Sequence, residues 1–193
     1  SNLYLTVRNR FSLDENFKIV QCNCSFKYLD PRPDLNEIGN YYKSSSYIPH
    51  KDSNTFTYKV AQLLSFRWKI KIISKYISKT NDILDFGSGS GKFKNYINSV
   101  GFNAYSADPY IQSDFSSLDE ILDSNKQFEA ITMWHSIEHI HELNLSISKI
   151  KKILTENGIL FIAIPNHYAV ERKYFNEDWI AYDAPRHLYH FDY

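Results

Sequence analysis

The feature that most constrains the fold of this chain is an alternating pattern of short strand-like runs and amphipathic helices. It begins after Thr80. Residues 83–86 form an apolar run that ends in a glycine-rich turn, and a helical face follows. Further strands are expected at 103–107 and 130–133, and at the fully apolar run 159–164. Strands that alternate with helices of this length favour a parallel sheet with both faces covered. We therefore predict an α/β fold, a three-layer sandwich around a mainly parallel sheet.

The residues before this rhythm predict an N-terminal arm and a helix. Residues 1–57 have no clear hydrophobic period, and Pro31 and Pro33 fix an extended or turned backbone. Apolar residues then recur at spacings of three and four over 58–79, which predicts a helix. We expect an arm over 1–57, which packs on another part of the chain, and a domain over 58–193.

The charge balance and the lack of long apolar segments exclude several classes of protein. The chain has 22 basic and 22 acidic side chains, so its net charge gives no reason to expect nucleic acid or a membrane surface as a partner. No apolar stretch is long enough for a membrane helix, and the N-terminus lacks a secretory pattern. Cys22 and Cys24 are one residue apart, which we expect to be a poor spacing for a bridge, and a reducing cytoplasm fits best.

The segment Asp85-Phe-Gly87-Ser-Gly89-Ser-Gly91 joins the first predicted strand to a helix. Glycines at such a junction let the backbone approach a ligand beside the free N–H groups of the helix N-terminus. Three kinds of nucleotide-type site compete for this pattern.

Two of the three fit poorly. A phosphate-binding P-loop needs Ser or Thr after Gly-Lys, where this chain has Phe93, and a first Gly where it has Phe86. The dinucleotide fingerprint needs its third Gly one residue later than Gly91, which also disfavours a nicotinamide-linked oxidoreductase.

An acidic residue followed by Gly-x-Gly-x-Gly resembles motif I of the class I S-adenosylmethionine (SAM) methyltransferases. In that family the loop cups the methionine part of the cofactor, and the acidic residue helps hold its amino group. The resemblance implies that Asp108, after the second strand, accepts the ribose hydroxyls, and that Asp114 contacts the adenine amino group. An ordinary loop aspartate is the alternative for Asp108. The residues implied in the loop itself are Asp85, Gly87, Ser88, Gly89 and Gly91.

The segment His135-Ser-Ile-Glu138-His139 allows several interpretations. It matches the pattern His-x-x-Glu-His, in which two histidines four apart on a helix share a zinc ion. It also resembles the segment after the fourth strand in SAM methyltransferases related to quinone-biosynthesis O-methyltransferases. That resemblance, which we favour, implies that Trp134 and His135 line the methionine and methyl-transfer pocket. Plain core or capping histidines are the third alternative, and we expect no metal.

The two ends of the chain narrow the family. Residues 24–33 and 38–42 resemble the leader of a bacterial subgroup, methyltransferase family 23, and residues 179–191 resemble its tail. Relatives often join two cysteine pairs around zinc, and no first pair precedes Ser1, so we expect a degenerate zinc-ribbon-like leader without zinc. The family implies a Rossmann-like sheet of strand order 3-2-1-4-5. Because the chain stops at Tyr193, we expect strands 6 and 7 to be missing and the domain to be C-terminally truncated.

These features lead to one predicted function and one alternative. We expect a cytoplasmic SAM-dependent methyltransferase that acts on a small or medium-sized acceptor and releases S-adenosylhomocysteine (SAH). His135, Arg186, His187 and His190 are the candidates for acceptor-side chemistry, because histidine is the natural base near neutral pH and Arg186 can pair with an acceptor anion. We expect the tail to close over the methyl group opposite His135, with structural packing as the alternative. The alternative function is a non-catalytic SAM- or nucleotide-binding or scaffold domain of the same fold.

Overall fold

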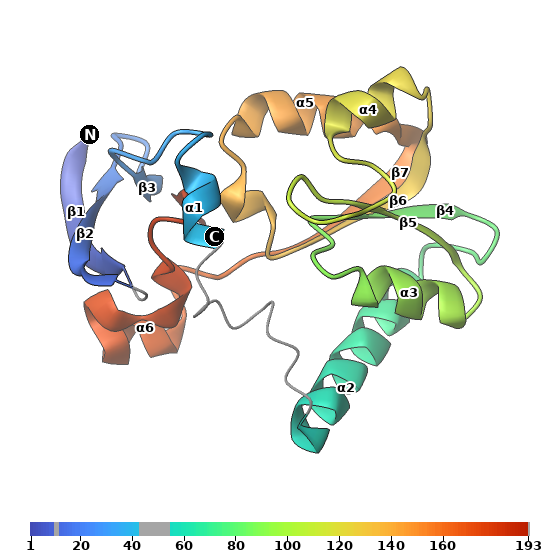
Figure 1. Ribbon diagram of the computed structural model, residues 1–193, viewed down its shortest axis with the longest axis horizontal. Coiled ribbons are helices and arrows are strands. Elements are labelled where there is room, and N and C mark those ends of the chain that lie inside the picture. Colours follow the sequence, from blue (N-terminus) through green and yellow to red (C-terminus); the bar gives the residue numbers. More distant parts are fainter. Residues whose placement is uncertain (10–11, 43–54, 193) are drawn as a thin grey trace. The chain divides into compact units, whose positions relative to one another are not determined.

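Two sheets organise the chain, one in each of two compact units (Figure 1). The computed structural model describes residues 1–9, 12–42 and 55–192. The first unit takes Ser1–Tyr47, His135–His141 and Ile164–Tyr193, and the second takes Ile48–Trp134 and Glu142–Ala163. The first unit therefore draws residues from both sides of the expected boundary at residue 57.

The sheet of the second unit is parallel throughout. Its strands lie in the order β5-β4-β6-β7, so the chain starts in the middle and adds strands on both sides. This topology confirms the predicted α/β, Rossmann-like fold, in which ligands bind beyond the carboxyl ends of the strands. The bounds are β4 (Asp82–Phe86), β5 (Asn103–Ala107), β6 (Phe128–Trp134) and β7 (Leu154–Ala163).

Helices cover both faces of this sheet, as the three-layer prediction requires. In Figure 1, α4 and α5 lie on one face and α3 lies on the other, next to α2. Ile73 and Ile77 pack with Phe93 and Ile97 against Ile83 in one buried cluster. The bounds are α2 (Phe56–Ile73), α3 (Lys92–Ser99), α4 (Leu118–Asp123) and α5 (Leu143–Ile153).

The expected order 3-2-1-4-5 is observed as β5-β4-β6-β7 for its last four members, and its third strand is reduced to a single bridge beside β5. Ala107 and Phe115 form one isolated parallel bridge beside β5. The chain cannot extend further as a strand because Ser117, two residues on, accepts a hydrogen bond from Glu120 N and caps α4. The Asp114 side chain instead accepts hydrogen bonds from the backbone and the hydroxyl of Ser106 in β5.

The first unit holds an antiparallel sheet in the order β1-β2-β3-β8, where we expected an irregular arm. The packing expected of the arm is present, because Val7, Ile19 and Leu29 form a buried cluster with Trp179 and Tyr182 of the tail. The strands are β1 (Asn2–Asn9), β2 (Ser12–Gln21), β3 (Lys27–Leu29) and β8 (Tyr189–His190). The helices are α1 (Ile38–Tyr42), α6 (Val170–Phe175), η2 (Ile137–His139), η3 (Asn176–Asp178) and η4 (Ile180–Tyr182).

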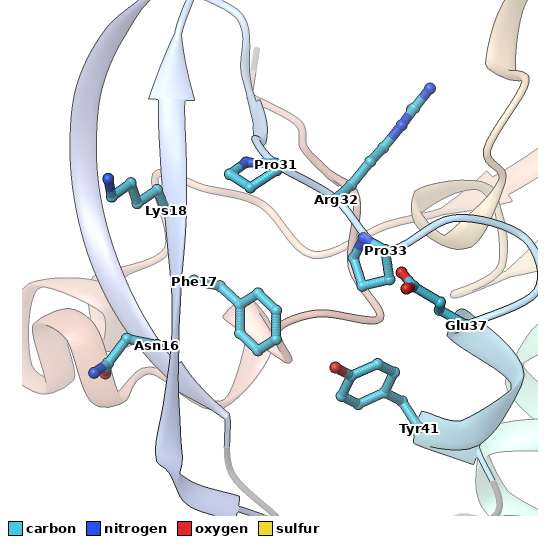
Figure 2. Close-up of a pocket in the computed structure, with 8 residues that line it drawn as sticks. All are labelled: Asn16, Phe17, Lys18, Pro31, Arg32, Pro33, Glu37 and Tyr41. Carbon is cyan, nitrogen blue, oxygen red and sulfur yellow. The ribbon is translucent and has the colours of Figure 1, made fainter.

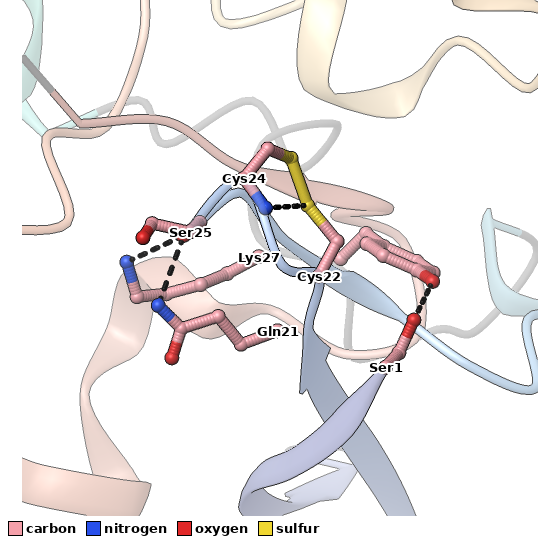
Figure 3. Close-up of a disulfide and its surroundings, with 7 residues drawn as sticks. Ser1, Gln21, Cys22, Cys24, Ser25 and Lys27 are labelled. Carbon is pink, nitrogen blue, oxygen red and sulfur yellow. Dashed lines mark hydrogen bonds between the residues drawn. A yellow bond between two sulfur atoms is a disulfide. The ribbon is translucent and has the colours of Figure 1, made fainter.

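Cys22 and Cys24 form a disulfide, so the expectation that their spacing disfavours a bridge is wrong (Figure 3). The turn between β2 and β3 brings their Cα atoms to 5.3 Å, within the usual range for a disulfide. Hydrogen bonds from Cys22 N to Phe26 O and from Ser25 N to Cys22 O hold this turn.

The chain leaves the parallel sheet after β7. Among the described residues β7 pairs only with β6, and the segment that follows it contributes β8 to the sheet of the first unit. No sixth or seventh strand joins the parallel sheet within the described residues. A search of the same residues for a helix long and apolar enough to cross a membrane finds none.

Candidate functional site

The glycine loop lies at the carboxyl end of β4 and requires its glycines. Gly87, Gly89 and Gly91 have φ angles of 72°, 53° and 69°, in the left-handed region that side chains disfavour. A Cβ at Gly89 would meet no atom within 4 Å, so the need for glycine is conformational. Gly87 N donates to Ala107 O at 2.8 Å, which ties the loop to the end of β5.

Asp85, the acidic residue before the loop, is buried at the end of β4. Thr132 Oγ1 donates a hydrogen bond of 2.8 Å to its carboxylate. Burial raises the pKa of Asp85 to about 6, against the lowering effects of this bond and of the Lys69 charge. The site thus contains a buried acid whose charge is incompletely compensated.

Asp108, predicted to hold the ribose, contacts the glycine loop directly. Gly89 N donates to Asp108 Oδ2 at 2.9 Å. The other carboxylate oxygen accepts from Tyr110 N at 2.9 Å and Ile111 N at 3.1 Å. The structure therefore brings two of the sequence-predicted cofactor elements together.

The carboxylate of Asp114 is bound by other side chains and backbone groups of the protein itself. Besides its bonds to Ser106, its carboxylate lies 3.0 Å from Lys94 Nζ. Burial would raise the pKa of Asp114, but the bonds from Lys94 and Ser106 outweigh it and lower the pKa. This carboxylate secures the short segment that replaces the third strand.

Two predicted cofactor residues carry buried polar atoms without a protein partner. Ser88 Oγ and Trp134 Nε1 are both buried and make no hydrogen bond to any described residue. Such groups are costly to bury unless a water or a ligand satisfies them. The site's chemistry therefore fits a polar ligand at the end of β4 and β6.

Lys69 of α2 lies beside this site as well. This residue was not identified from the sequence. Its Nζ lies 4.6 Å from the ring centroid of Trp134 and 4.9 Å from that of Phe93. Burial lowers the pKa of Lys69, and the charge of Asp85 opposes that shift. In the sequence Lys69 is one of several lysines within the helix predicted over 58–79, and nothing there distinguishes it from its neighbours.

The four acceptor-side candidates all belong to the first unit. His135 follows β6 directly, has a φ of 56° and exposes 62% of its side chain. Arg186 is buried and forms a bidentate pair with Asp183. His187 Nδ1 donates to Ala181 O at 2.8 Å. His190 is buried, and desolvation lowers its pKa to about 3.

A cluster of one carboxylate and two imidazoles lies in the same unit. Atoms of Glu138, His139 and His187 that can bind a metal lie within 4.8 Å of one another. Burial would raise the pKa of Glu138, but the proximity of His135 and the charges of His187 and His139 lower it. The sequence pattern pointed to His135 as the partner of His139, and it gave no sign of His187.

The first unit also contains an open pocket of about 410 Å³, lined by side chains of β2, α1 and the residues between β3 and α1 (Figure 2). Phe17 and Tyr41 meet edge to face there, at 6.2 Å between ring centroids. Arg32 donates hydrogen bonds to His141 O and the Tyr189 hydroxyl, and thereby joins the wall of the pocket to the tail.

Comparison with known proteins identifies the family. A family model described as a methyltransferase domain, that of methyltransferase family 23, matches residues 55–193, which is most of the chain. The chain therefore belongs to this methyltransferase family, as the glycine loop and the flanks indicated.

Solved structures provide more distant likenesses. Coclaurine N-methyltransferase, crystallised with N-methylheliamine and SAH, is 17% identical with a TM-score of 0.42 over 58% of this chain and 38% of that one. The PH0226 protein of Pyrococcus horikoshii OT3 is 18% identical with a TM-score of 0.42 over 64% of each chain. The chain thus spans less than two thirds of the length of either protein. No curated protein matches.

Proposed function

We propose that this chain binds SAM beyond the carboxyl ends of β4 and β5 and transfers its methyl group to a small or medium-sized acceptor. The cofactor is SAM and the product is SAH. The proposal goes beyond family membership in naming the binding residues, which are Asp85, Gly87, Ser88, Gly89, Gly91, Asp108 and Trp134.

The observation that carries this proposal is the hydrogen bond from Gly89 N to Asp108 Oδ2, at 2.9 Å. It joins the loop predicted to cup the methionine part to the carboxylate predicted to hold the ribose. The unpartnered Ser88 Oγ and Trp134 Nε1 support the same place, because a polar ligand there would satisfy both atoms.

Each carboxylate has a role that its surroundings support. Asp85 is buried with a single hydroxyl donor and a lysine nearby, so an incoming ammonium would stabilise its charged form. Asp108 accepts three backbone hydrogen bonds, and a carboxylate has about four acceptor positions, which leaves room for a ribose hydroxyl. Ser106 and Lys94 already bind the carboxylate of Asp114, so an adenine amino group would bind it in addition to these two partners.

Methyl transfer places modest chemical demands on the protein. When bound, the cofactor would supply an electrophilic methyl group on its sulfonium sulfur. An acceptor atom would form the bond to the methyl carbon in line with the breaking carbon–sulfur bond, and SAH would be the leaving group. The protein aligns the two partners, excludes water and accepts a proton where the acceptor carries one.

Among the four acceptor-side candidates, His135 is our first choice for the proton-accepting group. Its imidazole is exposed and directly follows Trp134 in the chain, whereas Arg186, His187 and His190 are buried and Arg186 is already paired with Asp183. We keep these three as groups that orient the acceptor or position the tail.

Mass spectrometry of the purified chain for co-purified SAM or SAH, followed by calorimetric titration with SAM, tests the binding. Transfer is then measured with methyl-labelled SAM and a panel of oxygen, nitrogen and carbon nucleophiles. Absence of SAM and SAH binding would refute the proposal. Tight SAM binding without transfer to any acceptor would favour the non-catalytic alternative.

A further inference from the structure

Glu138 is a buried carboxylate that lacks the partners such a group requires. Its side chain has no exposed surface, and neither carboxylate oxygen accepts a hydrogen bond within the described residues. The nearest basic atom, His135 Nδ1, lies 3.6 Å from Oε1, beyond hydrogen-bond distance. Isolated buried carboxylates are strongly unfavourable, so they are normally paired with a cation or bound to a metal.

The two neighbouring imidazoles are oriented by backbone carbonyls. His139 Nδ1 donates to Arg186 O at 3.0 Å and also lies 3.0 Å from the Tyr42 hydroxyl, and His187 Nδ1 donates to Ala181 O at 2.8 Å. A carbonyl oxygen can only accept, so each Nδ1 carries the proton, and in the neutral imidazole each Nε2 has a free lone pair. An Nδ1–H bonded to a carbonyl is the usual second contact of a histidine that binds metal through Nε2.

From these observations we propose that Glu138, His139 and His187 bind one divalent cation, for which zinc is the best match. One carboxylate oxygen and two imidazole nitrogens are a donor set that zinc prefers, and they leave a fourth position open. This site goes beyond the methyltransferase function, and it does not rest on it.

The distances are compatible with a site that closes by a small movement. The donor atoms lie within 4.8 Å of one another, and ligands of a tetrahedral zinc ion lie about 3.4 Å apart. The two segments are already joined, because Leu188 N donates to Glu138 O at 2.8 Å. Asp183 pairs with Arg186, which reduces the repulsion of a bound cation by that guanidinium.

The test measures zinc binding by calorimetry and by metal analysis after chelator treatment, without reductant. The wild-type chain should bind one zinc ion. Glu138→Gln and His187→Ala should each weaken binding by more than about 100-fold, since even an outer partner of a ligand is worth about 10–100-fold. His141→Ala is the matched control, because that histidine lies in the same segment but donates to Pro33 O, and it should bind zinc as the wild type does.

Cobalt provides a readout that depends on no variant. Cobalt bound to the wild-type chain should show the intense visible absorption of a four-coordinate site, and zinc should displace it. A weak six-coordinate spectrum, no stoichiometric binding, or unchanged zinc affinity in both Glu138→Gln and His187→Ala would each overturn the proposal. Loss of binding in Cys22→Ser alone would assign the metal to the cysteines and overturn it as well.

Discussion

Thr132 of β6 donates a hydrogen bond of 2.8 Å to the buried carboxylate of Asp85, its paired residue on β4. This bond is the main compensation for a charge held at the centre of the parallel sheet. It is not sufficient, because burial still raises the pKa of Asp85 to about 6 from an ordinary 3.8. The ionised carboxylate therefore lowers the stability of the folded protein.

Asp85→Asn should therefore stabilise the ligand-free protein. The pKa of Asp85 is about 6 in the folded state against an ordinary 3.8. At a pH where Asp85 is ionised in both the folded and the unfolded state, this difference lowers the free energy of unfolding by about 3 kcal/mol. The amide keeps an oxygen for Thr132 but carries no charge, so we expect about 1–3 kcal/mol more free energy of unfolding at pH 8. The gain should shrink as the pH falls through 6 and vanish near 3.8. Urea unfolding at several pH values measures it.

Asp82→Asn is the control for that variant. Asp82 lies on the same strand but pairs with Lys126 at 2.6 Å near the surface, so its loss should cost up to about 1 kcal/mol. Equal effects of the two substitutions would contradict the assignment of a buried charge to Asp85.

The affinity for SAM should depend on pH through the same carboxyl. If Asp85 pairs with the cofactor's ammonium, protonation of Asp85 removes the pairing charge, and a pKa of about 6 predicts about a tenfold loss of affinity from pH 7 to pH 5. Calorimetry with SAM at both values checks this. Adenosine, which lacks the ammonium, should bind equally at both, and a parallel loss for adenosine would exclude Asp85 as the cause.

Local sequence patterns predicted the strands and turns of the second unit, because residues close together in the sequence determine them. The run over 83–86 and the glycines that need positive φ are both visible within a few residues. The third strand is reduced to one bridge because Asp114 binds Ser106 where a longer strand would pair.

Long-range partners account for most of what was missed. β8 pairs with β3, and its Tyr189 lies opposite Tyr28 about 160 residues earlier. His187 joins Glu138 across 49 residues, and no spacing rule links them. β1 buries only Val7 and Asn9 completely, so its alternation is too weak to identify a strand.

Removal of the disulfide should have a modest effect on stability. The ring closed by Cys22 and Cys24 spans three residues, and loop entropy assigns such a short closure about 1.5 kcal/mol. Replacing both cysteines by serine should lower the free energy of unfolding by that amount. Reductant should lower the wild-type value equally and leave the serine variant unchanged. Two thiols that react with Ellman's reagent in the untreated folded protein would show that the bridge is absent.

Asp108→Ala should weaken SAM binding by about 1.5–3 kcal/mol, the usual contribution of hydrogen bonds to a charged group. The carboxylate also holds Gly89 N, so a loss of affinity alone would not separate the ribose contact from loop disorder. Discrimination between adenosine and 2′-deoxyadenosine separates them. The wild type should prefer adenosine and Asp108→Ala should lose that preference, whereas a preference that survives in the variant would remove Asp108 from the ribose.

Gly89→Val should abolish SAM binding and leave the chain folded. At a φ of 53° a β-branched residue is strained by about 1–2 kcal/mol, which a domain of this size tolerates, and no atom lies within 4 Å of the new Cβ. The methyl groups would instead occupy the space over the loop, where the proposal puts the methionine part of the cofactor. Gly39→Ala is the control, because Gly39 has equal space around it without a positive φ. Calorimetry with SAM and circular dichroism measure the two properties separately. A folded Gly89→Val protein with wild-type SAM affinity would exclude the loop from the cofactor site.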